Sequence, residues 1–281
     1  MKRRGKNKLV SPILKWAGGK KQLLPEIEKF LPDKIPTYYE PFLGGASVLF
    51  FIQPKVAYIN DYNRDLINVY DCVKNNLDEL LEDLKKHENS ADYFYKIREL
   101  DRKSSVFNKL TNVEKASRFI FLNKTCFNGL FRVNKAGEFN TPFGYYKSPN
   151  IVNETTLRAV SLYLNENDIK YFSLDFEEFL NRVKKNSFVY LDPPYDPISI
   201  SSNFTGYTNL GFDKKEQIRL KNVCDELDKK HVKFLLSNSA TDFIKDLYSK
   251  YNISIIKAKR SINSNANLRG SVDEVLIRNY E

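Results

Sequence analysis

The hydrophobic residues of this chain fall into short runs, each long enough for one buried strand of a parallel sheet. The clearest run is Phe188–Leu191, which is followed at once by Asp192 and two prolines. Because proline has no N–H to donate to a neighbouring strand, the strand must end there and leave a carboxylate at its carboxyl end. Seven strands are predicted, over residues 38–41, 56–60, 169–174, 187–191, 232–236, 253–256 and 274–277.

Apolar positions at helical spacing lie between these runs and predict an alternating α/β fold. One of the predicted helices carries Ile218, Val223 and Leu227 as its apolar residues. Residues 237–239 should form a turn, and residues 196–211, which lack periodicity, should form a loop that could close over a substrate. Helices are expected after Lys20, from about Val48, from Asp213 and over residues 241–249.

The alternation is interrupted between about residues 63 and 151. Leucines over residues 77–84 mark a helix, and a capping box of Thr111 and Glu114 begins another. Residues 130–133 and 138–140 look like short strands around an Asn-Lys-Ala-Gly turn, which predicts a hairpin. The hairpin region mixes cations with Asn and aromatic residues, a mixture that suits DNA, and a purely structural hairpin is the alternative.

Composition narrows the class of protein. The chain has 281 residues, of which 42% are apolar, so it can form one large domain or a domain with an insertion. We find neither an apolar run long enough to cross a membrane nor a signal core, and expect a cytoplasmic protein. Its three cysteines show no metal-binding spacing and fit free thiols. The only histidines, His87 and His231, are expected at the surface and outside any mechanism.

The charge distribution indicates a polyanionic partner. The formal net charge is +10, and the first twenty residues contain seven Lys or Arg without any acid. Residues 256–271 also lack acids and contain Lys257, Lys259, Arg260 and Arg269. Basic segments of this kind are typical of proteins that bind nucleic acid.

Two glycine pairs stand where a ligand could approach the backbone. Gly18-Gly19-Lys20 is not a phosphate-binding P-loop, because the first glycine and the Ser or Thr of that motif are missing. Gly44 and Gly45 lie between a strand and a helix, as in a cofactor loop. Asp61 ends the second strand, where α/β folds bind a pair of ribose hydroxyls; an acid in an ordinary turn is the alternative.

The segment Asp192-Pro-Pro-Tyr195 suits chemistry on an exocyclic amine. Such an amine is a poor nucleophile, because its lone pair is delocalised into the ring. A carboxylate and a proline carbonyl that accept its two hydrogens would direct the lone pair toward a methyl donor and disperse the charge that develops. Tyr195 could stack on a base drawn out of the duplex. The segment resembles the Asp-Pro-Pro-Tyr motif of the amino-methyltransferases.

Further motifs extend this resemblance from about Ile13 to Tyr280. They are Leu14-Lys-Trp-Ala-Gly-Gly-Lys20, Glu40-Pro-Phe-Leu-Gly-Gly45, Asp61-Tyr-Asn63, Phe127-Asn-Gly-Leu-Phe-Arg132, Gly137-Glu-Phe-Asn140, Pro142-Phe-Gly144 and Arg260-Ser-Ile-Asn-Ser-Asn265. As a set they resemble the Dam-type, or alpha-group, DNA adenine-N6 methyltransferases of bacteria, phages and restriction-modification systems.

The resemblance implies roles for individual residues. Asp192, Pro193 and Tyr195 would hold the target adenine. The S-adenosylmethionine site would comprise Trp16, Lys20, Glu40, Phe42, Gly44, Asp61, Asp175, Phe176 and Asp192. The residues that read or intercalate DNA would be Lys15, Phe127, Asn128, Leu130, Arg132 and Pro142.

The resemblance also implies a fold and a function. The fold would be a seven-stranded, Rossmann-like S-adenosylmethionine-dependent methyltransferase core with an inserted helical and hairpin DNA-recognition domain. Residues 1–62 and 152–281 would form the catalytic domain, and residues 63–151 would recognise the target. The enzyme would bind double-stranded DNA, flip an adenine, usually in GATC, and methylate N6 without a metal. It would be solitary or accompany a cognate restriction endonuclease.

Two other functions fit the sequence less well. RNA or protein-glutamine methyltransferases usually carry Asn in place of Asp192, so the aspartate and the hairpin both disfavour them. A DNA-binding regulator that has lost catalysis would need a damaged cofactor motif, and the motifs of this chain are intact.

Overall fold

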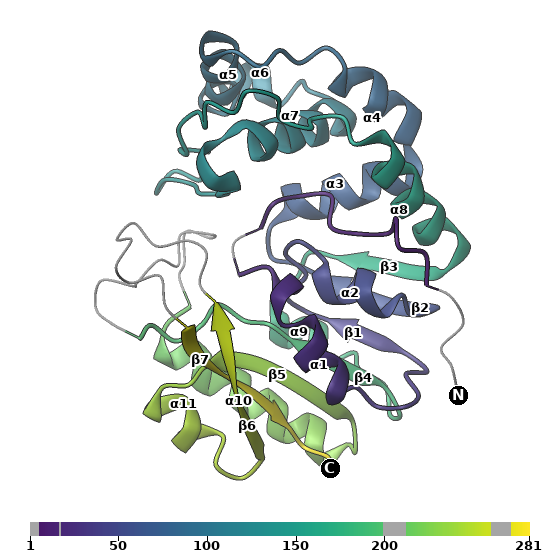
Figure 1. The fold of residues 1–281 in the computed structure, drawn as a ribbon, viewed down its shortest axis with the longest axis vertical. Helices are drawn as coiled ribbons and strands as arrows, with labels where there is room; N and C mark the ends of the chain where they lie inside the picture. The colour runs from purple at the N-terminus through teal and green to yellow at the C-terminus, as the bar shows by residue number, and fades with distance from the viewer. Residues whose placement is uncertain (1–5, 17, 199–211, 260–270) are drawn as a thin grey trace.

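The computed structural model of the chain describes residues 6–16, 18–198, 212–259 and 271–281. These residues form one seven-stranded sheet with helices on both faces and a helical lobe beyond one edge (Figure 1). The seven predicted strands are confirmed, with ends that differ by a few residues. They are β1 (Tyr38–Glu40), β2 (Val56–Asn60), β3 (Asp168–Phe172), β4 (Phe188–Leu191), β5 (Lys233–Ser239), β6 (Asn252–Lys259) and β7 (Ser271–Arg278).

The direction in which strands are added to the sheet reverses at its centre. The order is β3-β2-β1-β4-β5-β7-β6, and β7 runs antiparallel to both of its neighbours. The chain therefore builds outward in one direction from β1 and in the other from β4. α/β sheets bind ligands at the carboxyl ends of the strands beside such a reversal. Tyr39 of β1 pairs with Val189 of β4, so these two strands are neighbours. Glu40, the last residue of β1, and Asp192, which follows β4, therefore lie at the same end of adjacent strands.

Successive residues of each strand enter two hydrophobic cores on opposite faces of the sheet. Tyr38 and Phe188 pack on one face with the first group of helices, and Tyr39 and Val189 pack on the other with the second group. The first group comprises α1 (Leu24–Lys29), α2 (Ser47–Ile52) and α8 (Glu154–Glu166), and the second comprises α9 (Phe176–Leu180), α10 (Lys214–Lys229) and α11 (Asp242–Leu247).

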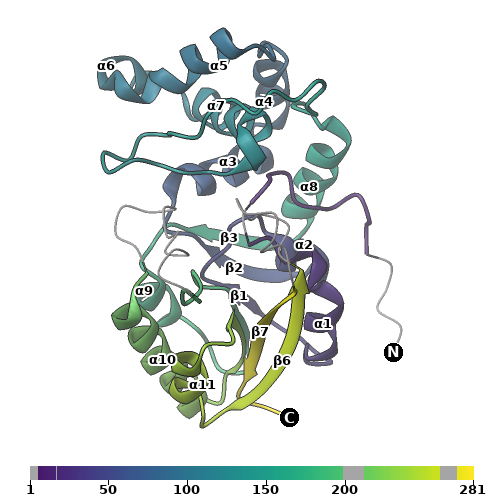
Figure 2. The ribbon, with the colours of Figure 1, turned by 60° about the vertical axis from the view of Figure 1, so that its left-hand side comes forward.

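The helical lobe lies beyond β3, with α3 (Arg64–Asn75) and α8 between it and the sheet (Figures 1 and 2). One hydrophobic core runs from the sheet through α3 into the lobe, so the two parts pack together. The predicted capping box is confirmed, because Thr111 Oγ1 accepts the Glu114 N–H and Glu114 Oε2 accepts the Thr111 N–H. The lobe contains α4 (Leu77–Leu84), α5 (Ala91–Arg98), α6 (Ser104–Phe107), α7 (Asn112–Thr125) and the 3-10 turns η2 (Glu99–Arg102) and η3 (Phe127–Gly129); a further 3-10 turn, η1 (Lys20–Gln22), precedes α1.

The predicted hairpin is only partly formed. The chain does reverse at residues 134–137, where the Gly137 N–H donates to the Asn134 carbonyl over 2.9 Å. The two flanking strands are absent from the described residues, and single bridges such as Val133 with Phe139 replace them. The N–H of Phe139 donates to Asp101, and the Asn134 side chain accepts the N–H of Glu138. The Asn134 side chain thereby takes the Glu138 N–H that a regular ladder would bond to the Asn134 carbonyl, whereas the Phe139 N–H faces away from the partner strand and is held by Asp101.

Three further predictions are corrected. Residues 237–239 are not a turn but the end of β5, because they pair with β7. Ile218 is 44% exposed, and Gln217 is buried in its place. His87 is not a surface residue: its ring stacks on Phe121 at 4.4 Å, and its two nitrogens contact hydroxyl groups.

Several sequence predictions fall outside the described residues. They are the basic residues 1–5, most of the loop at 196–211, and the segment that contains Arg260, Arg269 and the 260–265 motif. Cys72, Cys126 and Cys224 are buried free thiols, as predicted. Among the described helices, none combines the length and the apolar character needed to cross a membrane.

Candidate active site

Asp192 lies at the carboxyl end of β4 between a lysine and a serine. Lys20 Nζ is 2.8 Å from Asp192 Oδ1, and the Ser237 hydroxyl of β5 donates to the same oxygen over 2.8 Å. Lys20 is only 5% exposed, so the ion pair is poorly screened by water. Within the described part of the chain, no donor reaches Asp192 Oδ2. This oxygen is therefore available to accept a hydrogen from a substrate.

Tyr195 is held at both ends. The Lys20 ammonium lies 4.7 Å from the centre of its ring, and its hydroxyl donates to Glu274 Oε2 of β7 over 2.9 Å. Burial, and then the charges of Asp192 and Glu274, raise the pKa of Tyr195 well above its ordinary value. The phenol therefore stays neutral and keeps donating to Glu274, which fixes the plane of the ring beside the Asp192 carboxylate.

Two further carboxyl groups line the same end of the sheet. Glu40, at the end of β1, is 2% exposed and accepts the Tyr38 hydroxyl over 2.9 Å. Burial raises the pKa of Glu40 well above its ordinary value; the Tyr38 hydrogen bond opposes this shift, and the charges of Asp192 and Asp61 add to it. The charges of both neighbouring carboxylates therefore act on Glu40.

Asp61 closes the glycine loop. Its two carboxylate oxygens accept the N–H of Gly44 over 2.9 Å and the N–H of Asn63 over 3.0 Å. Burial raises the pKa of Asp61 to about 6, although these two hydrogen bonds lower it. The Gly44 backbone has a positive φ of 48°, a conformation that glycine adopts without strain. The Asp61 carboxylate therefore fixes the backbone of the glycine loop, and it can also accept hydrogen bonds from hydroxyl groups.

The indole of Trp16 covers this glycine loop. A Cβ atom added at Gly44 would lie 2.8 Å from the indole ring, so only glycine fits beneath it. The same ring stacks on Phe131 of the lobe at 5.6 Å and on Phe119 at 6.3 Å. Trp16 therefore touches both the glycine loop and the lobe.

Asp175 and Phe176 lie at the start of α9. The Asp175 carboxylate caps α9 through the Glu177 N–H and forms an ion pair with Arg219. The Phe176 ring lies 5.5 Å from the ring of Phe42, which follows β1. The resemblance implies that Asp175, Phe176 and Phe42 belong to one site, and in the structure the two rings lie side by side.

The residues expected to contact DNA cluster on the lobe. Phe127 is 52% exposed at a tight turn, and its N–H donates to the carbonyl of Pro142 over 2.8 Å. Asn128 adopts a positive φ of 55° and is also exposed. The carbonyl of Leu130, which is partly exposed, accepts the Thr141 hydroxyl. This arrangement presents an aromatic ring to solvent on a rigid turn.

The N-terminal segment is fixed to this turn. The side chain of Asn123, which is fully buried, bonds both the N–H and the carbonyl of Lys15 and also the carbonyl of Gly129. The Lys15 ammonium lies 4.0 Å above the ring of Tyr146. Lys15 therefore stands beside the exposed turn, where a cation can meet a phosphate or a base.

Arg132 is directed by its neighbour across the reversal. Its Nε donates to Asn140 Oδ1 over 2.6 Å, and one terminal nitrogen donates to the Asn140 carbonyl over 3.2 Å. A guanidinium has five N–H donors, so the outer edge of the fork keeps donors for another acceptor. Asn140 thus orients the Arg132 guanidinium without using all of its N–H donors.

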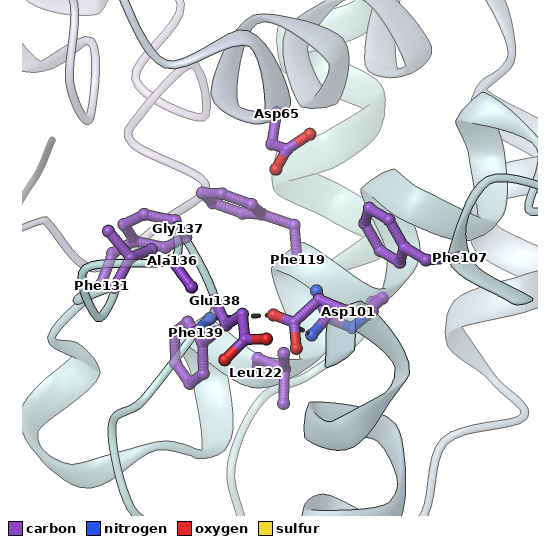
Figure 3. Close-up of a pocket in the computed structure, with 12 residues that line it drawn as sticks. Asp65, Asp101, Phe107, Phe119, Leu122, Phe131, Ala136, Gly137, Glu138 and Phe139 are labelled. Carbon is purple, nitrogen blue, oxygen red and sulfur yellow. Dashed lines mark hydrogen bonds and ion pairs between the residues drawn. The ribbon is translucent and has the colours of Figure 1, made fainter. Parts of the chain in front are cut away.

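A cavity of about 140 Å³ lies inside the lobe, beneath this reversal (Figure 3). Asp101 at its edge pairs with Arg118 of α7 over 2.8 Å and accepts the Phe139 N–H over 2.8 Å. None of the residues assigned to a site from the sequence lines this cavity. Asp101, in the polar part of the cavity wall, thereby supports the chain reversal that follows Arg132.

Several residues of the site were missed by sequence reasoning. Ser237 and Glu274 reach the Asp192–Tyr195 segment from β5 and β7. Asn60, which is 1% exposed, donates to the carbonyls of Pro41 and Leu174 and so ties β1 to the segment before α9. The one local signal was polar residues in or beside apolar strand runs, as in Ser237-Asn238-Ser239, which sequence reasoning took for a turn.

Comparison with known proteins identifies the family. A family model described as D12 class N6 adenine-specific DNA methyltransferase matches residues 16–262. The chain is 42% identical to the type II methyltransferase M1.LlaDCHI of Lactococcus lactis subsp. cremoris, over 98% of each chain. It is 43% identical to the type II methyltransferase M.MjaIII of Methanocaldococcus jannaschii, over 96% of this chain and 99% of that one. It is 34% identical to the DNA adenine methylase of Escherichia coli K12, over 94% and 93% respectively.

These matches confirm the resemblance found in the sequence, and the mixed seven-stranded sheet with flanking helices is the α/β core that such an enzyme needs. The family model covers the glycine loop, Asp61, the lobe and the Asp192–Tyr195 segment. The chain belongs to the D12 class of N6 adenine-specific DNA methyltransferases and is an adenine-specific DNA methyltransferase.

Proposed function

We propose that the chain methylates the N6 amine of a flipped adenine in a short duplex site, with S-adenosylmethionine as the methyl donor. The observation that carries the proposal is the geometry of Asp192, whose Oδ1 is held by Lys20 and Ser237 while Oδ2 is available. A fixed acceptor costs no reorganisation when charge develops on the amine, which is where electrostatic catalysis gains most.

The polar and aromatic groups at the carboxyl end of the sheet fit this cofactor. Asp61 and Glu40 could accept ribose hydroxyl or amino donors, and Lys20 could meet a carboxylate. The rings of Phe176 and Phe42 could enclose an adenine, and Trp16 could cover the glycine loop from the lobe side. When bound, the cofactor would supply a methyl group on a positively charged sulfur, and the Asp192 carboxylate suits that charge.

The target amine would be held by the Asp192–Tyr195 segment. Asp192 Oδ2 and the Pro193 carbonyl would accept the two N6 hydrogens, so that the nitrogen lone pair points to the methyl group. The positive charge that forms on nitrogen would be offset by the Asp192 carboxylate. Tyr195, whose plane is fixed by Glu274, would stack on the flipped base.

We further propose that residues 63–151 recognise the DNA and that residues 1–62 and 152–281 carry the catalysis. Phe127 would wedge between base pairs, Arg132 would read a guanine, and Lys15, Asn128, Leu130 and Pro142 would border the same site. The exposure of Phe127 and the orientation of Arg132 by Asn140 support these roles. The proposed target is GATC, where Arg132 would have a guanine to bond.

The names of two relatives support a place in a restriction-modification system, since both are called type II methyltransferases. A solitary enzyme, with no endonuclease of the same specificity, is the alternative. In either case we expect no obligatory complex, because the chain supplies both the catalytic segment and the DNA-facing turn.

One experiment tests the activity and the site together. Duplexes that contain GATC, or single-base variants of it, are incubated with enzyme and labelled S-adenosylmethionine and then digested with methylation-sensitive and methylation-dependent nucleases that cut GATC. We expect label only in the GATC duplex, with protection from the sensitive nuclease and cleavage by the dependent one. Label in DNA without a change in either digest would overturn the proposed site, and no labelling of any duplex would overturn the proposed cofactor.

A further inference from the structure

A glutamine occupies a position of α10 that the helical pattern would give to an apolar residue. Gln217 is 1% exposed, whereas its neighbour Ile218 is 44% exposed. Helices that cover a sheet normally bury their apolar side. A buried amide is unfavourable unless its donors and acceptors are bonded, so the partners of Gln217 indicate what it does.

Those partners belong to, or contact, the Asp192–Tyr195 segment, which is the proposed catalytic segment. Gln217 Nε2 donates to the carbonyl of Pro194 over 2.9 Å. Its Oε1 accepts from Asn238 Nδ2 over 3.1 Å, and Asn238 Oδ1 accepts the N–H of Asp196 over 3.0 Å. The two amides therefore bind the backbone on both sides of Tyr195 from beneath.

Asp196 is bound by the same end of β5. Its carbonyl accepts the Ser239 hydroxyl over 2.6 Å, and its Oδ2 accepts the Thr241 hydroxyl over 2.7 Å. Asn238 and Ser239 are 0% and 1% exposed, so water does not compete for these bonds. Buried polar groups that satisfy one another in this way make a local structure rigid.

The catalytic segment needs an external support because of its own sequence. Neither Pro193 nor Pro194 has an N–H, so this stretch cannot fix its conformation through its own backbone donors. In the part of the chain that the structure describes, the carbonyl of Pro194 has a donor in Gln217, whereas that of Pro193 has none. Gln217 thus bonds the carbonyl of Pro194 and leaves the carbonyl of Pro193 to accept from the substrate amine.

We propose that Gln217, oriented by Asn238, is a positioning residue that sets the direction of the Pro193–Pro194 backbone and thereby aligns the target amine. The inference rests on the proposed role of the Asp192–Tyr195 segment. It places the determinant of amine alignment on α10 and β5, beneath the segment, and gives it no contact with DNA or cofactor.

The test compares turnover with binding in the Gln217→Met variant. Methionine keeps the length and shape of the side chain but removes both hydrogen bonds. We expect kcat for methylation of the duplex to fall about 10- to 100-fold, as a small misplacement of reacting groups does. The KM for DNA and the Kd for S-adenosylmethionine should stay within about twofold, because only an interaction that aligns the transition state is lost.

A matched control is Gln53→Met. Like Gln217, Gln53 donates from its amide to the backbone, in this case to the carbonyls of Asn7 and Phe50, but it lies at the end of α2 and these bonds reach no residue of the site. Its kcat should equal that of the wild type. A role of Gln217 in folding alone would lower the midpoint of thermal unfolding and leave kcat unchanged at temperatures well below it, which would overturn the proposal.

Two more variants separate the possible failures. If Gln217→Met does not fold, Asn238→Ala removes the group that orients Gln217, and the same criteria for kcat, KM and Kd apply to it. Asp192→Ala tests the catalytic segment itself. Normal turnover in Asp192→Ala would refute the proposed function, whereas an inactive Asp192→Ala together with a normal kcat in both network variants would refute this inference alone.

Discussion

Asp61 gives the sharpest test of the cofactor site, because its ionisation falls in an accessible pH range. Burial raises its pKa from 3.8 to about 6, and its two oxygens hold the N–H groups of Gly44 and Asn63. If the ionised carboxylate also accepts the ribose hydroxyls, Asp61→Asn should weaken S-adenosylmethionine binding by about 1.5–3 kcal/mol, the usual contribution of a hydrogen bond to a charged group.

The pH dependence follows from the same pKa. With a pKa of about 6, Asp61 is mostly ionised at pH 7 and about one-tenth ionised at pH 5. If only the ionised form binds well, the affinity of the wild type should fall about tenfold between these values, or about 1.4 kcal/mol. The loss runs toward low pH because protonation removes the acceptor. Asp61→Asn should lack this component, since an amide does not titrate.

Calorimetry at half-unit intervals from pH 5 to pH 7.5, on both proteins, measures the difference directly. Glu40 is present in both proteins, and the Asp61 charge is one of the smaller causes of its raised pKa, so the component that Asp61→Asn lacks is assigned to Asp61 only where it centres near pH 6. Asp168→Asn, at the exposed start of β3, is a matched control that should behave as the wild type. Equal affinities of wild type and Asp61→Asn at pH 7.5, or parallel pH profiles, would refute the assignment of Asp61 to the cofactor.

Three further predictions concern catalysis, specificity and stability. Asp192→Ala should abolish methyl transfer while DNA binding in a gel-shift assay persists; more than a few per cent of the wild-type rate would contradict its catalytic role. Arg132→Ala should cost about 1–3 kcal/mol at the cognate duplex and much less at duplexes altered at the guanine it reads, with the slope of affinity against salt nearly constant. A uniform loss at every duplex, with a slope reduced by about 1, would instead indicate a phosphate contact. Thr111→Ala should lower the free energy of unfolding in urea by about 1 kcal/mol through loss of the capping box, without changing kcat; an unchanged midpoint would show that the cap contributes nothing.

The sequence was sufficient for the existence of the seven strands and for the end of β4. Short apolar runs mark strands because a strand that is buried on both faces must be apolar at successive positions. The prolines after Asp192 end β4 by their own covalent structure, so the position of that carboxylate needed no tertiary information. The glycines at 44 and 45 and the acid at 61 likewise followed from the requirements of a tight loop at the end of a strand.

The tertiary structure decided which side chains support those residues. Ser237, Glu274 and Gln217 meet the Asp192–Tyr195 segment only because β5, β7 and α10 come together at the end of β4, and the apolar periodicity of α10 gives no sign that a glutamine lies on its buried face. The hairpin differs from the predicted pair of strands because the Asn134 side chain accepts the Glu138 N–H that a strand partner would have bonded. Asp101, 38 residues away from Phe139 along the chain, then anchors the reversal by accepting the N–H of Phe139 that faces away from the partner strand. Local propensity sets what a segment can form, and distant donors and acceptors determine what it does form.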